Sequence, residues 1–170
     1  MSMDDWRDKF QARELKVGVV GLGYVGLPLA VSFGKNRLSV LGFDVNEAKV
    51  QTLNEGASYI SDVASEDIKV LRAKSLIEAT TDFKRLSECD AISVCVPTPL
   101  RKTREPDLTY IVEATNQVAQ YLRPGQLIVL ESTTYPGTTV EVVAPRLEAS
   151  GYKIGKEIFL AFSPERIDPG

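Results

Sequence analysis

The chain has 170 residues, of which 44% are hydrophobic and 25% are charged, as in ordinary soluble globular domains. Its 20 basic and 23 acidic residues give a net charge of −3, which argues against nucleic acid or an anionic membrane as the main partner. No apolar run approaches the ~20 residues of a membrane span, and the acidic N-terminus is unlike a secretory signal. We therefore expect a cytoplasmic protein.

The residue types that are missing or rare also limit the chemistry. The chain has no histidine, which excludes a Ser-His-Asp or Cys-His arrangement and any His-ligated metal within these residues. Its two cysteines, Cys89 and Cys95, lack metal-ligand spacing and flank an apolar run. We expect buried thiols in a reducing compartment and no metal site.

The predicted elements alternate along the chain. A short helix over residues 4–14 comes first, with Trp6 and Phe10 on one face, as a packing arm or a frayed end. Strands are predicted at 16–20, 39–43, 77–80, 90–96, 126–130 and 157–162. Helices are predicted at 25–34, 46–54, 65–72, from near Asp107, and at 138–149. Strands separated by helices predict an α/β fold, a Rossmann-type doubly wound parallel sheet of about six strands with helices on both faces.

The strongest motif is Gly21-Leu22-Gly23-Tyr24-Val25-Gly26, which joins the first strand to the next helix. In such a turn Gly21 permits the tight bend, Gly23 lets a pyrophosphate approach the backbone, and Gly26 lets the helix pack on the strand. The start of the helix, including Tyr24 and Val25, offers unpaired N–H groups to the anion. The alternative is an ordinary glycine-rich turn, but the flanking strand and helix favour dinucleotide binding.

Asp44 ends the second strand, close to the spacing expected for the acid that binds the adenosine ribose. A carboxylate there accepts from the 2′-hydroxyl and repels a 2′-phosphate, so NAD is preferred to NADP. Asp44 could instead only cap the following helix. Lys49 lies one turn further on, either near the ribose or simply in solvent. Residues 16–170 are thus predicted to form an NAD-binding domain, preceded by an arm at 1–15.

Three further segments follow strand ends, where open α/β sheets bind their ligands. Pro97-Thr98 follows the fourth strand and Ser132-Thr133 the fifth, so we predict that all four residues contact the cofactor. Glu165-Arg166 follows the last strand, which places a carboxylate at the same edge. The alternative for Pro97-Thr98 is a rigid proline turn. For Ser132-Thr133 it is a hydroxyl that caps a helix, and for Glu165 it is a surface glutamate.

These stretches together resemble the UDP-glucose/GDP-mannose dehydrogenase family, from about Val17 to Gly170. The matching pieces include the glycine motif with Leu27-Pro28, Gly42-Phe43-Asp44, Val96-Pro97-Thr98-Pro99, Pro106-Asp107-Leu108, Ser132-Thr133 and Ser163-Pro164-Glu165. The resemblance implies oxidation of the C6 alcohol of a nucleotide sugar to the carboxylate, with two NAD reduced. It also implies a catalytic cysteine and lysine beyond residue 170, so that neither Cys89 nor Cys95 is the nucleophile and this chain alone is inactive.

The resemblance also implies site roles and a substrate class. Thr133 and Glu165 would be catalytic, orienting water or the substrate hydroxyl, and Glu165 and Arg166 would bind substrate. The UDP-glucose branch has a second glutamate where this chain has Pro169, which favours the branch that acts on UDP-N-acetylhexosamines. Arg101, Lys102 and Arg104 either reach the substrate diphosphate or form a solvated loop.

We therefore expect UDP-N-acetyl-D-glucosamine as the substrate, with UDP-N-acetylmannosamine or UDP-glucose as alternatives. Polysaccharide biosynthesis and a homo-oligomeric full-length enzyme are further expectations. A function of another class is a non-catalytic NAD(H)-binding or redox-sensing module, which a natural chain end near Gly170 would favour. A β-hydroxyacid dehydrogenase starts with a similar fold, but the segments around Thr98, Thr133 and Glu165 weigh against it.

Overall fold

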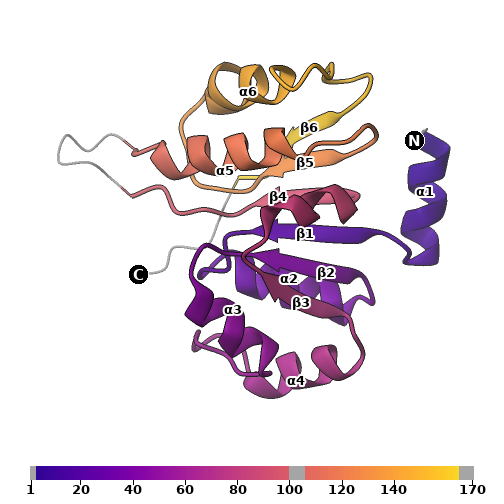
Figure 1. Cartoon of the computed structure of the whole chain (residues 1–170), viewed down its shortest axis with the longest axis vertical. Coiled ribbons are helices and arrows are strands. Elements are labelled where there is room, and N and C mark those ends of the chain that lie inside the picture. Colours follow the sequence, from indigo (N-terminus) through magenta and orange to yellow (C-terminus); the bar gives the residue numbers. More distant parts are fainter. Residues whose placement is uncertain (1–2, 100–105, 165–170) are drawn as a thin grey trace.

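A six-stranded parallel sheet forms the centre of the molecule (Figure 1). The computed structural model describes residues 3–99 and 106–164. The strands are β1 (Lys16–Val20), β2 (Ser39–Phe43), β3 (Ile77–Thr80), β4 (Ala91–Val94), β5 (Leu127–Leu130) and β6 (Phe159–Phe162). They lie in the order β3-β2-β1-β4-β5-β6, and every neighbouring pair is parallel. The chain reverses its direction of travel across the sheet between β1 and β4, which makes this the topological switch point.

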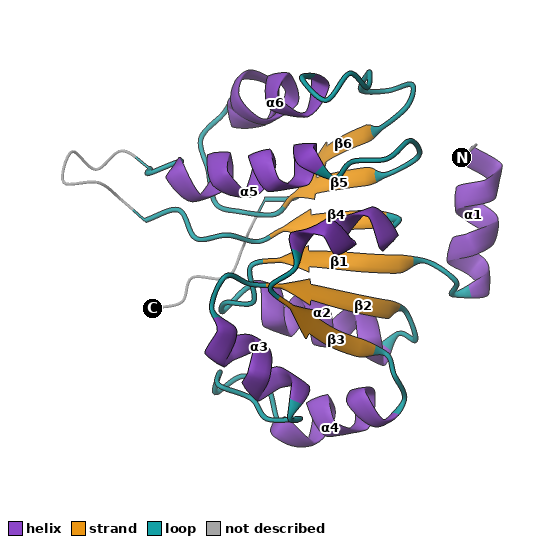
Figure 2. Cartoon of the chain, viewed as in Figure 1, coloured by secondary structure: helices purple, strands orange, loops and turns teal. Residues whose placement is uncertain are grey.

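Helices connect the strands and cover the sheet (Figure 2). The α-helices are α1 (Met3–Ala12), α2 (Gly26–Lys35), α3 (Glu47–Asn54), α4 (Ser65–Ala73), α5 (Thr109–Gln120) and α6 (Ala144–Glu148). A 3₁₀ helix, η1 (Phe83–Glu88), precedes β4, and a π-helix, η2 (Thr138–Val143), runs into α6. The predicted α/β Rossmann-type fold is confirmed.

The core is divided into two clusters because successive residues of a strand face opposite sides of the sheet. In β1, Val17 and Val19 belong to the first cluster, which also contains buried residues of α2 and α4. Val20 belongs to the second, with buried residues of η1, α5 and α6. Both faces of the strands are therefore apolar and covered by helices, as in doubly wound sheets.

Helix α1 is anchored at the edge where the strands begin, opposite the edge to which the strands point (Figure 2). The Trp6 indole donates to the carbonyl of Gly125 at 3.1 Å, and Lys9 pairs with the buried carboxylate of Asp90 at 3.3 Å. The arm is therefore packed against the sheet rather than frayed. Phe10 is 52% exposed, so of the two aromatic side chains predicted on one face of the helix only Trp6 packs against the core.

Several predicted boundaries differ from the structure. The fourth strand stops at Val94 rather than Val96, and the last begins at Phe159 rather than Glu157. The helix expected from near Asp107 begins at Thr109, although the Asp107 carboxylate still accepts from the Thr109 N–H at 3.0 Å. The single helix expected at 138–149 is a π-helix followed by a short α-helix. No helix of the described residues is long and apolar enough to cross a membrane.

Candidate cofactor-binding site

The glycine turn between β1 and α2 contains two glycines at which a Cβ would clash with the backbone. Gly21 has a φ of +91°, and a Cβ there would lie 2.8 Å from the carbonyl oxygen of Cys95. A Cβ on Gly26 would lie only 1.8 Å from the carbonyl oxygen of Gly21. The first glycine therefore makes the bend, and the third brings α2 against the end of β1, as the motif predicts.

Gly23 is different, because nothing in the folded chain requires a glycine there. Its φ is not positive, and a Cβ added to it meets no atom within 4 Å. Across residues 3–99 and 106–164, no protein oxygen accepts from the backbone N–H of Gly23, Tyr24, Val25 or Gly26. Open space beside unpaired donors at a helix start is what a pyrophosphate requires. The turn therefore fits the phosphates of a dinucleotide.

The Asp44 carboxylate lies beside this turn, at the end of β2. One of its oxygens, Oδ2, accepts from the Leu22 N–H at 2.9 Å, and Oδ1 accepts from the Asn46 N–H at 2.9 Å. The helix cap is a different residue, since the Asn46 side chain accepts from the backbone N–H groups of Ala48 and Lys49. Asp44 therefore faces the turn, as predicted, and does not serve only to cap α3.

Lys49 and Tyr59 complete the cluster around Asp44. The ammonium of Lys49 lies 3.4 Å from Asp44 Oδ2 and 6.0 Å from the centre of the Tyr59 ring. The Tyr59 hydroxyl donates to the Leu22 carbonyl at 2.8 Å. Lys49 therefore lies beside the acid expected to bind the ribose, and its own contact with the ribose stays a prediction. Tyr59 lies in the irregular connection between α3 and α4, where no periodic pattern or motif points to a role, and the sequence analysis missed it.

The segments after β4 and β5 are joined by hydroxyl groups. Ser132 is buried and donates to the carbonyl of Val96 at 2.8 Å, and the Thr98 hydroxyl donates to the carbonyl of Thr133. The Thr133 side chain is exposed. The structure thus brings Thr98, Ser132 and Thr133 together, with the Ser132 and Thr98 hydroxyls bonded to backbone. Pro97 is exposed beside them. Cofactor contacts by these four residues remain predictions.

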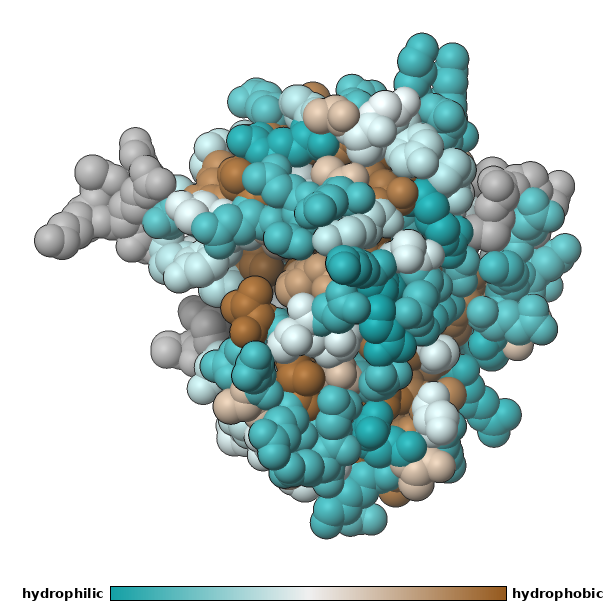
Figure 3. Space-filling model, in the orientation of Figure 1, coloured by the Kyte–Doolittle hydropathy of each residue, from teal (hydrophilic) through white to brown (hydrophobic). Residues whose placement is uncertain are grey.

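Large exposed hydrophobic residues occur where four strands end. Tyr24 follows β1, Val45 follows Asp44 at the end of β2, Tyr135 follows β5, and Phe162 is the last residue of β6. In the described part of the chain, the other large exposed hydrophobic residues lie on helices: Phe10, Val70, Tyr110 and Val140. The face of the molecule seen in Figure 3 is mostly hydrophilic. The carboxyl edge of the sheet therefore combines polar backbone with apolar side chains suited to flat rings.

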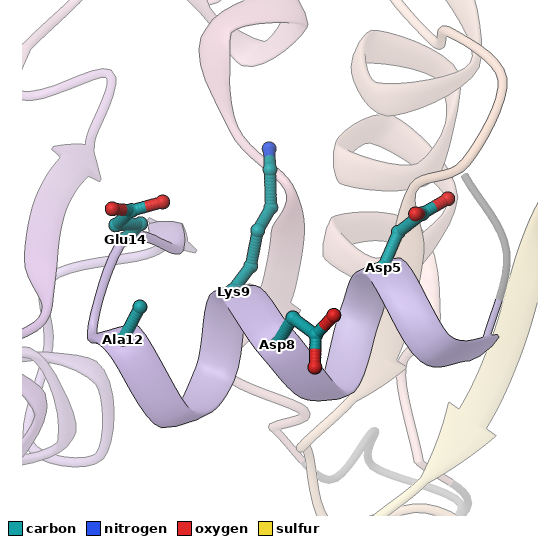
Figure 4. Close-up of a pocket in the computed structure, with 5 residues that line it drawn as sticks. All are labelled: Asp5, Asp8, Lys9, Ala12 and Glu14. Carbon is teal, nitrogen blue, oxygen red and sulfur yellow. The ribbon is translucent and has the colours of Figure 1, made fainter.

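Some predicted residues lie outside the described residues: Glu165, Arg166 and the basic residues Arg101, Lys102 and Arg104. A shallow depression of about 420 Å³ lies along α1 (Figure 4). It is lined by Asp5, Asp8, Lys9, Ala12 and Glu14. Among the described residues no three potential metal ligands cluster.

The two cysteines are buried and form no disulfide. Burial raises the pKa of the Cys89 thiol to about 12, with the charges of Glu88 and Asp90 adding to this and those of Lys16 and Arg123 opposing it. A thiol of this kind stays protonated near neutral pH and is a poor nucleophile. This agrees with the expectation that the catalytic cysteine is neither of these.

The sheet order, the glycine turn and the acid after β2 define a Rossmann domain that binds a dinucleotide. The chain belongs to the UDP-glucose/GDP-mannose dehydrogenase family, because the model of that family's NAD-binding domain matches residues 15–170. The cofactor of this domain is NAD, as predicted.

The relatives act on nucleotide sugars. The UDP-N-acetyl-D-glucosamine 6-dehydrogenases of Pseudomonas aeruginosa and Salmonella typhi are 43% and 39% identical over 93% and 95% of this chain. The chain spans 37% of the length of each of them. The solved structure of NDP-N-acetyl-D-galactosaminuronic acid dehydrogenase from Methanosarcina mazei superimposes with a TM-score of 0.84 at 35% identity, covering 98% of this chain and 38% of that one.

Proposed function

We propose that this chain is the NAD-binding part of a nucleotide-sugar 6-dehydrogenase, which oxidises the C6 alcohol of a UDP-sugar to the uronic acid. The observation that carries the proposal is the Asp44 carboxylate, which is held against the glycine turn by the Leu22 N–H. In that position it can accept from an unphosphorylated adenosine ribose while the turn binds the pyrophosphate.

Bound NAD would supply the hydride acceptor, with two NAD reduced and one water consumed for each C6 alcohol converted to the carboxylate. The chain's own residues would bind and orient the reactants. The unpaired N–H groups of Gly23, Tyr24 and Val25 hold the pyrophosphate, and Asp44 with Lys49 holds the ribose. In this proposal Thr133 and Glu165 orient the substrate hydroxyl or water, and Glu165 with Arg166 contacts the substrate. The proposal places the catalytic cysteine and lysine outside residues 1–170.

The proposed substrate is UDP-N-acetyl-D-glucosamine, with UDP-N-acetylmannosamine and UDP-glucose as alternatives. Two of the relatives above carry the name UDP-N-acetyl-D-glucosamine 6-dehydrogenase, which supports this choice. A substrate panel on the full-length protein tests this choice, with UDP-GlcNAc, UDP-ManNAc, UDP-Glc and GDP-Man compared by kcat/KM. The highest value is expected for UDP-GlcNAc, and a higher value for any of the other three would contradict it.

Cofactor choice is tested on the chain itself by calorimetry with NAD, NADH and NADP. We expect the wild type to bind NAD in preference to NADP. The D44N variant should bind NAD about tenfold more weakly and lose most of its preference, because the ribose acceptor loses its charge. The matched control is D82N, since Asp82 is an exposed cap that only accepts from the Lys84 N–H and asparagine caps equally well. Tighter binding of NADP than of NAD by the wild type would overturn the proposal.

The proposal also covers the setting of the full-length protein: cytoplasmic, homo-oligomeric and active in polysaccharide biosynthesis, with a UDP-sugar as its partner. The competing function of another class is a non-catalytic NAD(H)-binding or redox-sensing module. NADH formation by the full-length protein in the presence of a UDP-sugar separates the two. The chain alone should bind cofactor and form no NADH from any UDP-sugar.

A further inference from the structure

The two peptide units on either side of the Leu22 Cα are each held by a hydrogen bond. On one side the Leu22 N–H donates to Asp44 Oδ2 at 2.9 Å, and on the other the Leu22 carbonyl accepts from the Tyr59 hydroxyl at 2.8 Å. Asp44 comes from the end of β2 and Tyr59 from the connection between α3 and α4. Two separate segments therefore determine the orientation of this one residue of the glycine turn.

The Tyr59 hydrogen bond has a geometric consequence for Gly23. A trans peptide is planar, so its carbonyl and its N–H point in opposite directions. Fixing the Leu22 carbonyl toward Tyr59 therefore turns the Gly23 N–H away from it. That N–H has no acceptor among the described residues, and the space beside Gly23 is open.

The same hydrogen bond affects the first turn of α2. In a regular α-helix the Leu22 carbonyl would be the acceptor for the N–H of Gly26, four residues on. Here it accepts from Tyr59, and the first hydrogen bond of the turn runs from the Leu27 N–H to the Gly23 carbonyl at 3.0 Å. Within residues 3–99 and 106–164, the Gly26 N–H is thus one of the donors without a protein acceptor.

Tyr59 is itself well placed to hold this orientation. Its ring packs against the first core cluster, and its neighbour Ile60 is buried in that cluster. The Ser58 backbone N–H donates to the Ser65 hydroxyl at 2.9 Å, which ties the connection to the start of α4. Burial, followed by the charge of Asp44, raises the pKa of Tyr59, so its hydroxyl remains a protonated donor through the neutral range.

We propose that Tyr59 is a positioning residue for the cofactor, whose hydroxyl orients the Leu22–Gly23 peptide so that the Gly23 N–H faces the pyrophosphate. Tyr59 acts through the backbone and touches no reacting atom. The inference rests on the proposed function, because it assumes that a dinucleotide occupies the glycine turn.

The test compares three ligands that all contain adenosine, of which NADH and ADP carry a diphosphate and adenosine does not. Dissociation constants for NADH, ADP and adenosine are measured on the 170-residue chain and on Y59F, which keeps the ring, its packing and its contact with Lys49. We expect Y59F to bind NADH and ADP about fivefold more weakly and adenosine less than about twofold more weakly, as for the loss of one hydrogen bond of ordinary net strength. The matched control is Y121F, since Tyr121 packs against the second core cluster, and it should leave all three constants unchanged.

The ratio of the NADH and adenosine constants separates positioning from a loss of stability. Partial unfolding of Y59F would lower both apparent affinities by one common factor and leave their ratio unchanged. Equal weakening of NADH and adenosine, or an NADH constant within about twofold of the wild type, would overturn the role of Tyr59. Absence of NADH binding by the wild type would instead remove the proposed function.

Discussion

Asp44 and Leu22 are joined by a hydrogen bond of 2.9 Å from the backbone N–H of Leu22 to the carboxylate. It connects the end of β2 to the glycine turn that follows β1, so the group expected to bind the ribose and the groups expected to bind the pyrophosphate form one unit. A displacement of either strand end would disturb both halves of the site together.

Gly23 and Gly26 should differ sharply when each is replaced by alanine. G23A should fold as the wild type does, because its Cβ meets no atom within 4 Å, but it should bind NADH at least about tenfold more weakly, since the methyl group fills the space beside the donors. G26A should be destabilised by about 1–3 kcal/mol or more, because its Cβ would overlap the Gly21 carbonyl. Urea unfolding and NADH fluorescence titration measure the two effects.

The G23A and G26A variants also serve as controls for each other. If G23A lost stability as G26A does, the space beside Gly23 would not be open. If G23A bound NADH as the wild type does, the pyrophosphate would not lie there.

The glycine turn shows how far the sequence analysis reached. The roles of Gly21 and Gly26 follow from local rules for bending and close packing, and the structure confirms them. The position of Asp44 follows from one βαβ unit of standard length. By contrast, Tyr59 contacts Leu22 from 37 positions away through an irregular segment, and such a contact leaves no pattern in the sequence.

Ser132 and Thr133 are adjacent, yet their hydroxyls should have separate roles. S132A should cost about 1–3 kcal/mol of folding free energy, because the buried hydroxyl donates to the Val96 carbonyl, which would be left without this donor. T133V should change stability by less than about 0.5 kcal/mol, since this side chain is exposed. In the full-length protein T133V should lower kcat if Thr133 orients the substrate hydroxyl. Urea unfolding and steady-state kinetics check the two halves, and a kcat equal to that of the wild type would remove Thr133 from the catalytic set.

The attachment of α1 should depend on pH through Asp90. Burial raises the pKa of Asp90, but hydrogen bonds from the Lys16 backbone, Arg123 and Lys9 outweigh it and hold the pKa below its usual value. The stabilisation is therefore fully present above about pH 4, the ordinary value for aspartate, and is lost as the pH falls through the lowered folded-state value. Emission of Trp6, the only tryptophan, should report this loss.

D90N should remove this acid transition and loosen α1 already at neutral pH. The matched control is D62N, since Asp62 is exposed and accepts only from the neighbouring Ser61 hydroxyl. An acid transition in D90N identical to that of the wild type would assign it to other carboxylates.

Neither thiol should react in the folded chain. Cys89 and Cys95 are 0% and 5% exposed, and with a pKa of about 12 only about one Cys89 thiol in ten thousand is ionised at pH 8. Titration with a thiol reagent should detect no fast-reacting group in buffer and two in urea. One thiol reacting in buffer as fast as a free small-molecule thiol would contradict the burial of that cysteine.

The features that the sequence analysis did not resolve are those that tertiary contacts decide. Trp6 and Phe10 share a helical face, but only the contact with Gly125 determines which of them is covered. The π-helix at Thr138–Val143 begins after Gly137, whose φ is +95°, and runs directly into α6, where Pro145 has no N–H to donate to the preceding turn. The short 3₁₀ helix η1 has too few residues for a clear periodicity.

The central position of β1 in the sheet also bears on how the chain acquires its shape. Lys16, at the start of β1, bonds to Asp90, just before β4, across 74 positions of sequence, whereas β1, β2 and β3 follow one another directly. Closing so long a segment costs more chain entropy than closing a short one. We expect the first three strands to assemble early with α2 and α4, even during synthesis on the ribosome. Strand β4 should pair later with the free edge of β1.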